Sequence, residues 1–147
     1  MSGHDRLLGC AFEDLAEGMS AVISKTVTEA DIALFAGVSM DTNPLHLDEA
    51  FAAGTRFGGR IAHGMLGASL ISAIFGTKLP GPGAIYVSQN LRFKAPVRIG
   101  DTLLAEVTVT ALEPVRQRVE FATRVRVGDT VVIDGEAVLM VPRKESR

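Results

Sequence analysis

The sequence is poor in the residues that build disulfide-bonded or metal-bound scaffolds. Its single cysteine, Cys10, excludes an internal disulfide and a cysteine-based zinc cage, and it fits a reducing compartment. We interpret Cys10 as a tail or small packing residue. Charge is also sparse: charged residues make up 22% of the chain and the formal net charge is −2. This balance lacks the electrostatic footprint of a nucleic-acid-binding protein, so no nucleic acid partner is expected.

Targeting and membrane segments are lacking as well. Residues 1–14 contain several acidic side chains, without the basic start and apolar run of a secretory signal peptide. The longest uncharged apolar stretch, residues 61–77, is too short to span a bilayer comfortably, and it contains a histidine and two serines. We therefore expect a cytoplasmic protein with no membrane partner.

The residues that are present suit one globular domain. The chain has 147 residues, of which 47% are hydrophobic, and a chain of this size can bury a core without staples. The pattern differs between the two halves: residues 28–76 have helical character, whereas residues 84–142 form a succession of strands. A first strand is expected over residues 19–27.

Cap residues predict where the first helices begin. Thr28 can cap a helix, because acidic residues follow it in the first turn. The apolar side of this helix would be formed by Ile32, Leu34, Phe35 and Val38. A polar loop over residues 39–45 follows, and Asp48 can then cap a short helix over residues 49–53.

Residues 61–75 are apolar or small on nearly every side, which predicts a helix buried all round. Four strands are predicted after it, over residues 84–97, 102–112, 116–127 and 130–141. Consecutive long strands imply an antiparallel sheet. One buried helix and one such sheet predict an α+β fold in which the sheet wraps around the long central helix.

The polar loop contains the first candidate for chemistry, Asp41-Thr42-Asn43-Pro44-Leu45-His46. Proline restricts its own φ and the conformation of Asn43, so the loop is stiff. A stiff loop can hold the carboxylate of Asp41 and the imidazole of His46 at one point, where they could deprotonate a water molecule. The hexapeptide by itself suits a surface turn with Asx bonds at least as well.

The start of the buried helix is the second candidate. A helix N-terminus offers free N–H groups, and Gly64 has no Cβ, so a ligand carbonyl could approach its N–H as in an oxyanion hole. Packing of a small residue against a strand explains Gly64 equally well. Ser72 lies about 80° around the helix from Gly64. We interpret His63 as structural and expect no metal, since His46 and His63 share no ligand spacing on one helix.

Together these motifs resemble the MaoC-like (R)-specific enoyl-CoA hydratases. Asp41-x-Asn43-Pro44-x-His46 resembles the hydratase motif of that family, and Ile61-Ala62-His63-Gly64-Met65-Leu66 looks like the start of its central helix. The similarity continues through Phe93-Lys94-Ala95-Pro96-Val97 and Gly135-Glu136-Ala137. It covers residues 17–142 and resembles the short hydratases that feed polyhydroxyalkanoate synthesis. We therefore expect an N-terminal extension over residues 1–16 and a MaoC-like domain over residues 17–147.

The resemblance implies a hot-dog fold and a homodimer. It also implies the reversible, cofactor-free hydration of trans-2-enoyl-CoA to (R)-3-hydroxyacyl-CoA. It assigns the catalytic roles to Asp41 and His46 and the binding of the thioester carbonyl to the N–H of Gly64. An Asp/His pair that activates water and a donor that stabilises the enolate are physically consistent with this reaction.

Substrate contacts are expected along the same helix. Phe75 lies about 20° from Gly64 in projection, so the acyl chain would run toward its ring, and short to medium chains would fit. The expected substrate-binding residues are Asn43, Ile71, Ser72 and Phe75. The basic residues that could contact the phosphates of CoA, or simply form a solvated surface, are Arg56, Arg60, Arg92, Lys94 and Arg98.

Three other functions stay open. A 3-hydroxyacyl-ACP dehydratase would carry out the reverse reaction on a carrier protein, and a large basic patch would favour it. A thioesterase needs a carboxylate aimed at the thioester carbonyl, which the loop of Asp41 and His46 fits less well than hydration. A non-catalytic acyl-CoA-binding domain would have been favoured by loss of either residue, and both are present.

Overall fold

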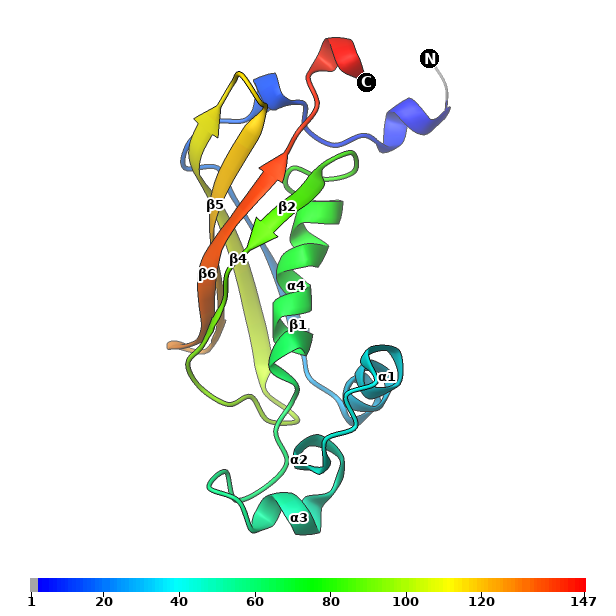
Figure 1. Cartoon of the computed structure of the whole chain (residues 1–147), viewed down its shortest axis with the longest axis vertical. Coiled ribbons are helices and arrows are strands. Elements are labelled where there is room, and N and C mark those ends of the chain that lie inside the picture. Colours follow the sequence, from blue (N-terminus) through cyan, green and yellow to red (C-terminus); the bar gives the residue numbers. More distant parts are fainter. Residues whose placement is uncertain (1–2) are drawn as a thin grey trace.

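The computed structural model describes residues 3–147, so that residues 1–2 of the predicted extension lie outside the described residues. Figure 1 shows an elongated molecule in which a long helix, α4, lies along one twisted sheet. Three short helices, α1 to α3, lie at one end of the molecule, and both termini lie at the opposite end. The chain between α3 and α4 connects the helical end to the long helix.

Within residues 3–147 the helical elements are four α-helices and three short 3-10 segments. The α-helices are α1 (Glu29–Ser39), α2 (Pro44–Leu47), α3 (Glu49–Ala53) and α4 (Gly64–Thr77). The 3-10 segments are η1 (Gly3–Leu7), η2 (Phe12–Asp14) and η3 (Lys144–Ser146). No helix among residues 3–147 has the length and apolar character needed to cross a bilayer.

The strands form one antiparallel sheet. They are β1 (Ser20–Thr26), β2 (Ile85–Gln89), β3 (Arg92–Phe93), β4 (Thr102–Glu113), β5 (Arg118–Val127) and β6 (Thr130–Met140). Their order is β1-β4-β5-β6-β2, and the short β3 also pairs with β6. The α+β class, the antiparallel sheet and the three long C-terminal strands are therefore confirmed.

Side-chain caps start α1 and α3 where the sequence predicts. Thr28 Oγ1 accepts from the backbone N–H of Asp31, and the Asp31 carboxylate accepts from the N–H of Thr28, which is a capping box. Asp48 Oδ1 accepts from the N–H of Phe51 and caps α3 in the same way. The predicted apolar side of α1 is wrong in part, because Leu34 and Val38 are 69% and 81% exposed.

The long helix begins later than predicted. Residues 61–63 are extended, because the N–H of Ala62 donates to Val97 O at 2.7 Å and the N–H of Ile61 donates to Leu45 O at 3.3 Å. These two bonds hold the chain between the β3–β4 connection and α2. The helix therefore starts at Gly64, with His63 as the N-cap residue and without a side-chain cap.

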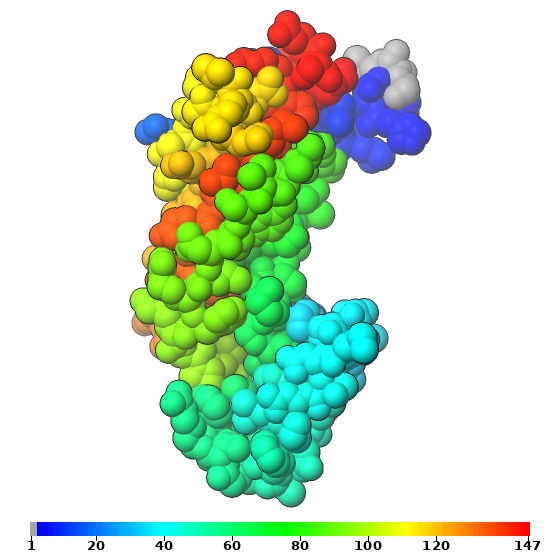
Figure 2. Space-filling model, viewed as in Figure 1, coloured from blue at the N-terminus to red at the C-terminus, as the bar shows by residue number. Residues whose placement is uncertain are grey.

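The prediction that this helix is buried all round is wrong. One side packs on β1, β4, β5 and β6, while Met65, Ser69 and Ser72 on the other side are exposed. These residues are spaced four and three apart, so they form one stripe along the helix. Figure 2 shows that the outer side of α4 lies in a recess between α1 and the N-terminal segment. The small residues that suggested close packing on every side therefore lie partly on an open surface.

The single strand predicted over residues 84–97 is also wrong. It is divided into β2 and β3 at Asn90, whose N–H donates to Glu136 O at 2.9 Å. The carbonyl oxygen of Asn90 approaches Gly135 so closely that a Cβ there would lie 1.9 Å from it. Only glycine at position 135 allows this approach. The break turns the chain so that Phe93 pairs with Ile133.

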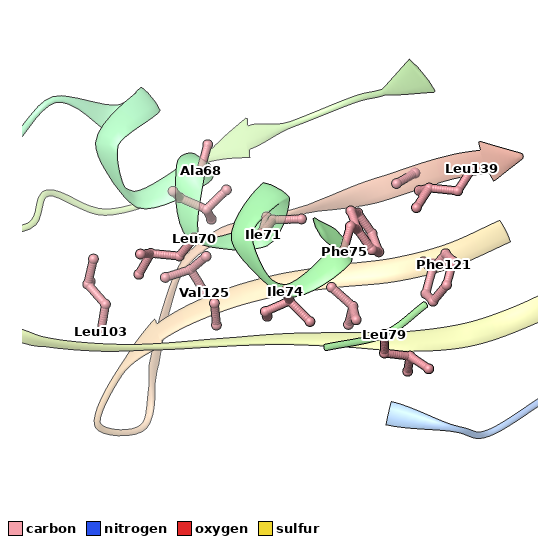
Figure 3. Close-up of a cluster of buried hydrophobic side chains, with 14 of the residues drawn as sticks. Ala68, Leu70, Ile71, Ile74, Phe75, Leu79, Leu103, Phe121, Val125 and Leu139 are labelled. Carbon is pink, nitrogen blue, oxygen red and sulfur yellow. The ribbon is translucent and has the colours of Figure 1, made fainter. Parts of the chain in front are cut away.

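The core lies between α4 and the sheet (Figure 3). The inward-facing residues of β4, Leu103, Ala105, Val107 and Val109, are all buried, as their alternation predicts. The N-terminal segment contributes too, because Phe12 is buried in the same core cluster. This arrangement of an antiparallel sheet against one long helix is the expected hot-dog fold.

Candidate active site

The loop before α2 presents Asp41 and His46 on a framework of local hydrogen bonds. The N–H of Asn43 donates to Asp41 Oδ1 at 3.2 Å, and Asn43 Oδ1 accepts from the N–H of Leu45 at 3.0 Å. Asn43 is thereby the N-cap of α2, and Pro44 occupies its first turn, where a missing N–H costs nothing. The Asx turn favoured for the hexapeptide alone is present, and it is the device that orients the two candidate catalytic residues.

His46 is buried, with 7% of its surface exposed, and its two ring nitrogens have different surroundings. Nδ1 lies 2.7 Å from the carbonyl oxygen of Ile61. A carbonyl only accepts, so Nδ1 carries the proton and donates. In the neutral ring the lone pair is then on Nε2, which lies 3.9 Å from Asp41 Oδ2. Because Nδ1 donates to Ile61 O, the nitrogen that can accept, Nε2, faces the carboxylate of Asp41.

Asp41 completes a pair of acceptors. Its side chain is 50% exposed, so the carboxylate reaches solvent while His46 stays buried. A separation of 3.9 Å between Asp41 Oδ2 and His46 Nε2 is longer than a direct hydrogen bond. One water molecule within about 2.8 Å of both atoms can donate one hydrogen to each. The pair is therefore suited to hold a water molecule and take its proton.

The first residue of α4 faces the same space. Gly64 opens the helix, where the first N–H groups have no partner within the helix. A Cβ on Gly64 would lie 2.8 Å from the ring of Phe93, so a larger residue here would require this ring to move. The N–H groups here point along the positive end of the helix dipole, which favours a developing negative charge.

Asp41, His46 and Gly64 line one cavity of about 430 Å³. Its walls come from the segment before α4, the start of α4 and the β3–β4 connection. The apolar lining residues include Phe57, Ile61, Met65, Phe93, Val97, Leu103 and Ile133. Two basic residues, Arg56 and Lys94, also border it. The cavity combines an apolar wall with a few polar groups, as small-molecule sites do.

Arg60, for which the sequence allowed a phosphate contact or a solvated surface, connects two helices beside the site. Its two terminal nitrogens donate to the carboxylate of Glu29 at 2.9 and 2.7 Å, and its Nε donates to His46 O at 2.6 Å. Hydrogen bonding from this guanidinium lowers the pKa of the Glu29 carboxyl. Arg60 therefore joins α1 to α2 directly behind His46, and three of its five N–H donors are in use.

The remaining basic candidates divide into two groups. Arg92 is paired with Asp134 and Glu136, and it does not line the cavity, so the structure does not place it near the other candidates. Arg98 donates to the carbonyl of Phe57. Arg56 and Lys94 line the cavity and are the two that lie where a ligand could reach them, and Lys94 Nζ also lies 3.3 Å from Asp134 Oδ2.

Four predicted substrate contacts do not line the cavity, namely Asn43, Ile71, Ser72 and Phe75. Asn43 caps α2, and Ser72 lies on the exposed stripe of α4. Ile71 is fully buried, and the ring of Phe75 lies 4.8 Å from that of Phe121 and 5.2 Å from that of Tyr86. Their assignment as substrate-binding residues stays a prediction.

The contacts of His63 with both candidate catalytic residues were not predicted from the sequence. Its Nε2 lies 2.9 Å from the carbonyl oxygen of Asp41, and its ring is stacked on the ring of His46 with centroids 3.9 Å apart. The adjacency of His63 to Gly64 was the only signal, because Asp41 is 22 residues away. Spatial proximity between separate loops is not encoded in local spacing.

The same three side chains approach metal-site geometry. Asp41, His46 and His63 each offer one ligand atom, and these atoms lie within 4.8 Å of one another. We expected no metal because His46 and His63 share no ligand spacing on one helix. The fold instead brings these side chains together from separate segments, so helical spacing does not decide the question. However, His46 Nδ1 and His63 Nε2 are bonded to carbonyl groups, and His63 Nδ1 is buried. The Asp41 carboxylate and His46 Nε2 stay available, fewer than the three or four protein ligands that zinc takes.

Comparison with known proteins adds independent findings. A family model described as "MaoC like domain" matches residues 13–131. The chain is 59% identical to the (R)-specific enoyl-CoA hydratase of Rhodospirillum rubrum, covering 98% of this chain and 99% of that protein. It is 53% identical to the 3-hydroxybutyryl-CoA dehydratase of Methylorubrum extorquens, covering 91% and 85%. The solved (R)-hydratase from A. caviae involved in PHA biosynthesis matches with a TM-score of 0.85 and 47% identity, covering 88% and 99%.

Proposed function

The chain belongs to the MaoC-like domain family, and from this premise we propose that it catalyses the reversible hydration of trans-2-enoyl-CoA to (R)-3-hydroxyacyl-CoA. The observation that carries the proposal is the cavity into which Asp41, His46 and Gly64 all face. We also propose that its product supplies polyhydroxyalkanoate synthesis, as the resemblance implies. The experiment that tests it follows loss of enoyl-thioester absorbance with crotonyl-CoA and the configuration of the product.

The first chemical step activates water. A water molecule held between Asp41 Oδ2 and His46 Nε2 has both hydrogens directed at acceptors, so a lone pair of its oxygen is free to attack C3. One of its protons passes to the pair as the C–O bond forms. Because the two groups are 3.9 Å apart and share this proton, we treat them as one acid–base unit.

The electrons of the C2–C3 double bond move toward the thioester carbonyl in the same step. The resulting enolate oxygen would be stabilised by the N–H of Gly64 at the start of α4. A proton returned from the acid–base unit to C2 completes the reaction. The addition of water involves no net oxidation or reduction, so the reaction as proposed uses no redox cofactor, and CoA is part of the substrate.

We propose that two copies of the chain form a homodimer through the open side of α4 and strand β2. β2 lies at one edge of the sheet, where its backbone groups are free to pair with another strand. Ile85, Tyr86 and Val87 of this strand are 52%, 40% and 48% exposed, and Met65 of α4 is 55% exposed. An exposed apolar edge strand, together with Met65 and small residues on the open side of α4, favours burial against a second copy.

The CoA part of the substrate gives a prediction about the two basic residues at the cavity. Removing either charge by Arg56→Gln or Lys94→Gln is expected to raise KM for crotonyl-CoA about two- to fivefold, because exposed ion pairs contribute about 0.2–1 kcal/mol. Steady-state kinetics at low and high salt measure this effect. Arg124→Gln is the matched control, since Arg124 is paired with Glu106 and does not line the cavity. A KM unchanged by both cavity substitutions would refute the contact.

The acyl chain gives a second prediction, for Phe75. Because its ring is buried against Phe121, Phe75→Ala is expected to lower the free energy of unfolding by about 3–5 kcal/mol. If the acyl chain also runs along α4 to this ring, activity on octenoyl-CoA should rise relative to crotonyl-CoA. Chemical denaturation and paired kinetics measure the two effects. An unchanged chain-length ranking in the folded variant would leave Phe75 as a core residue only.

A further inference from the structure

His63 is buried at the start of α4, and its side chain has contacts that a helix cap does not need. It is 2% exposed and forms no cap bond to the helix that it precedes. Its Nε2 lies 2.9 Å from Asp41 O, and because a carbonyl only accepts, Nε2 carries the proton and donates. Its Nδ1 is buried and has no hydrogen-bond partner among the described residues. The polar contact that His63 makes is therefore with the backbone of a candidate catalytic residue.

The ring of His63 also contacts the other member of the pair. It is stacked on the ring of His46, with centroids 3.9 Å apart and an interplanar angle of 29°. On α1 the ring of Phe35 lies 4.9 Å from that of His63, tilted by 58°. The His46 ring is thus held by the hydrogen bond from Nδ1 to Ile61 O and by the face of His63.

Both contacts come from the residue directly before Gly64. One side chain therefore connects three parts of the site: the backbone of Asp41, the ring of His46 and the helix start that would bind the carbonyl. Catalytic groups must be held within about 0.5 Å of the productive geometry, and a displacement of about 1 Å can cost 10²-fold in rate. A contact that fixes both members of an acid–base pair has a direct effect on turnover.

We propose that His63 is a positioning residue for the hydration reaction, which acts through its Nε2–H on Asp41 and through its ring face on His46. The inference rests on the proposed function. It differs from a role in core packing, which would affect stability without a specific effect on kcat. It also differs from a substrate contact, which would affect KM.

Two substitutions separate the two contacts. His63→Gln keeps an N–H donor at about the reach of Nε2 and removes the ring, whereas His63→Phe keeps the ring and removes the donor. Each is expected to lower kcat for crotonyl-CoA about 10- to 100-fold, with KM within threefold of wild type. Ile32→Val is the control, because it removes a fully buried methyl group of α1 and no polar group. It should lower the melting temperature and leave kcat unchanged.

Three outcomes would overturn the proposal. They are kcat within threefold of wild type in both His63 variants, an effect confined to KM, or loss of folding in both variants, which would make His63 a stability residue. The chemical shifts of the His46 ring protons give a readout without turnover, since ring stacking affects them. They should change in His63→Gln more than in His63→Phe. If the wild-type protein hydrates no enoyl-CoA, the proposed function fails, and the His46 shifts still decide whether His63 positions that ring.

Discussion

Asp41→Asn and His46→Ala are each expected to lower kcat of enoyl-CoA hydration on the order of 10²–10⁴-fold, the usual contribution of a positioned acid–base group. An amide at position 41 offers Oδ1 as an acceptor but cannot take a proton at neutral pH. Removal of the imidazole leaves the water molecule with one acceptor instead of two. Steady-state kinetics with crotonyl-CoA measure both effects.

The folded state should survive both changes. Asp41 is half-exposed, and the asparagine oxygen can still accept from the N–H of Asn43. Asp129→Asn makes the same chemical change at an exposed turn position between β5 and β6 and serves as the matched control. If either site variant stays within a few-fold of wild type while its far-UV circular dichroism is unchanged, the assignment of the pair is wrong.

Gly64→Val is expected to produce the second large effect, a fall in kcat on the order of 10²–10³-fold, as removal of one oxyanion donor does. The N–H of Gly64 is retained, but the new side chain blocks the approach of the thioester oxygen. Its Cβ would lie 2.8 Å from the Phe93 ring, so the ring must also move. Stopped-flow or steady-state turnover measures the loss.

Two further variants separate blocked approach from displacement of Phe93. Gly37→Val places the same side chain in another helix, α1, at an exposed position where a Cβ meets nothing within 4 Å, and should keep full activity. Phe93→Ala removes the ring that Gly64→Val would displace. We expect the double variant Gly64→Val/Phe93→Ala to stay impaired relative to Phe93→Ala. Restored turnover in the double variant would show that Gly64 matters for packing against Phe93 and not for the carbonyl.

The parts of the fold that could be predicted depend on local chemistry. Alternation in β4 and β5 predicted which side chains are buried, because successive residues of a strand face opposite sides. Thr28 and Asp48 marked helix starts, because side-chain capping needs only residues within one turn. The stiffness of the loop around Pro44 is also predictable locally, because proline restricts its own φ and the backbone conformation of Asn43 before it.

The rest depends on contacts between distant segments. The break at Asn90 follows from its approach to Gly135, and the guanidinium of Arg60 is taken by Glu29, 31 residues earlier. The sequence did not predict the open side of α4. Small and apolar residues suit a helix buried on every side, and they suit equally a helix that packs on its own sheet and on a second copy of the chain. The contact of His63 with Asp41 spans 22 residues and two loops. Periodicity and spacing carry no information about such pairs.

The most direct test of the central claim is one assay with purified wild-type protein. Crotonyl-CoA is added, the absorbance of the enoyl thioester is followed, and the product is tested with an (R)-specific and an (S)-specific 3-hydroxyacyl-CoA dehydrogenase. If the protein is an (R)-specific hydratase, the absorbance falls and the product is oxidised by the (R)-specific dehydrogenase alone. Unchanged absorbance, or a product taken by the (S)-specific enzyme, would contradict it.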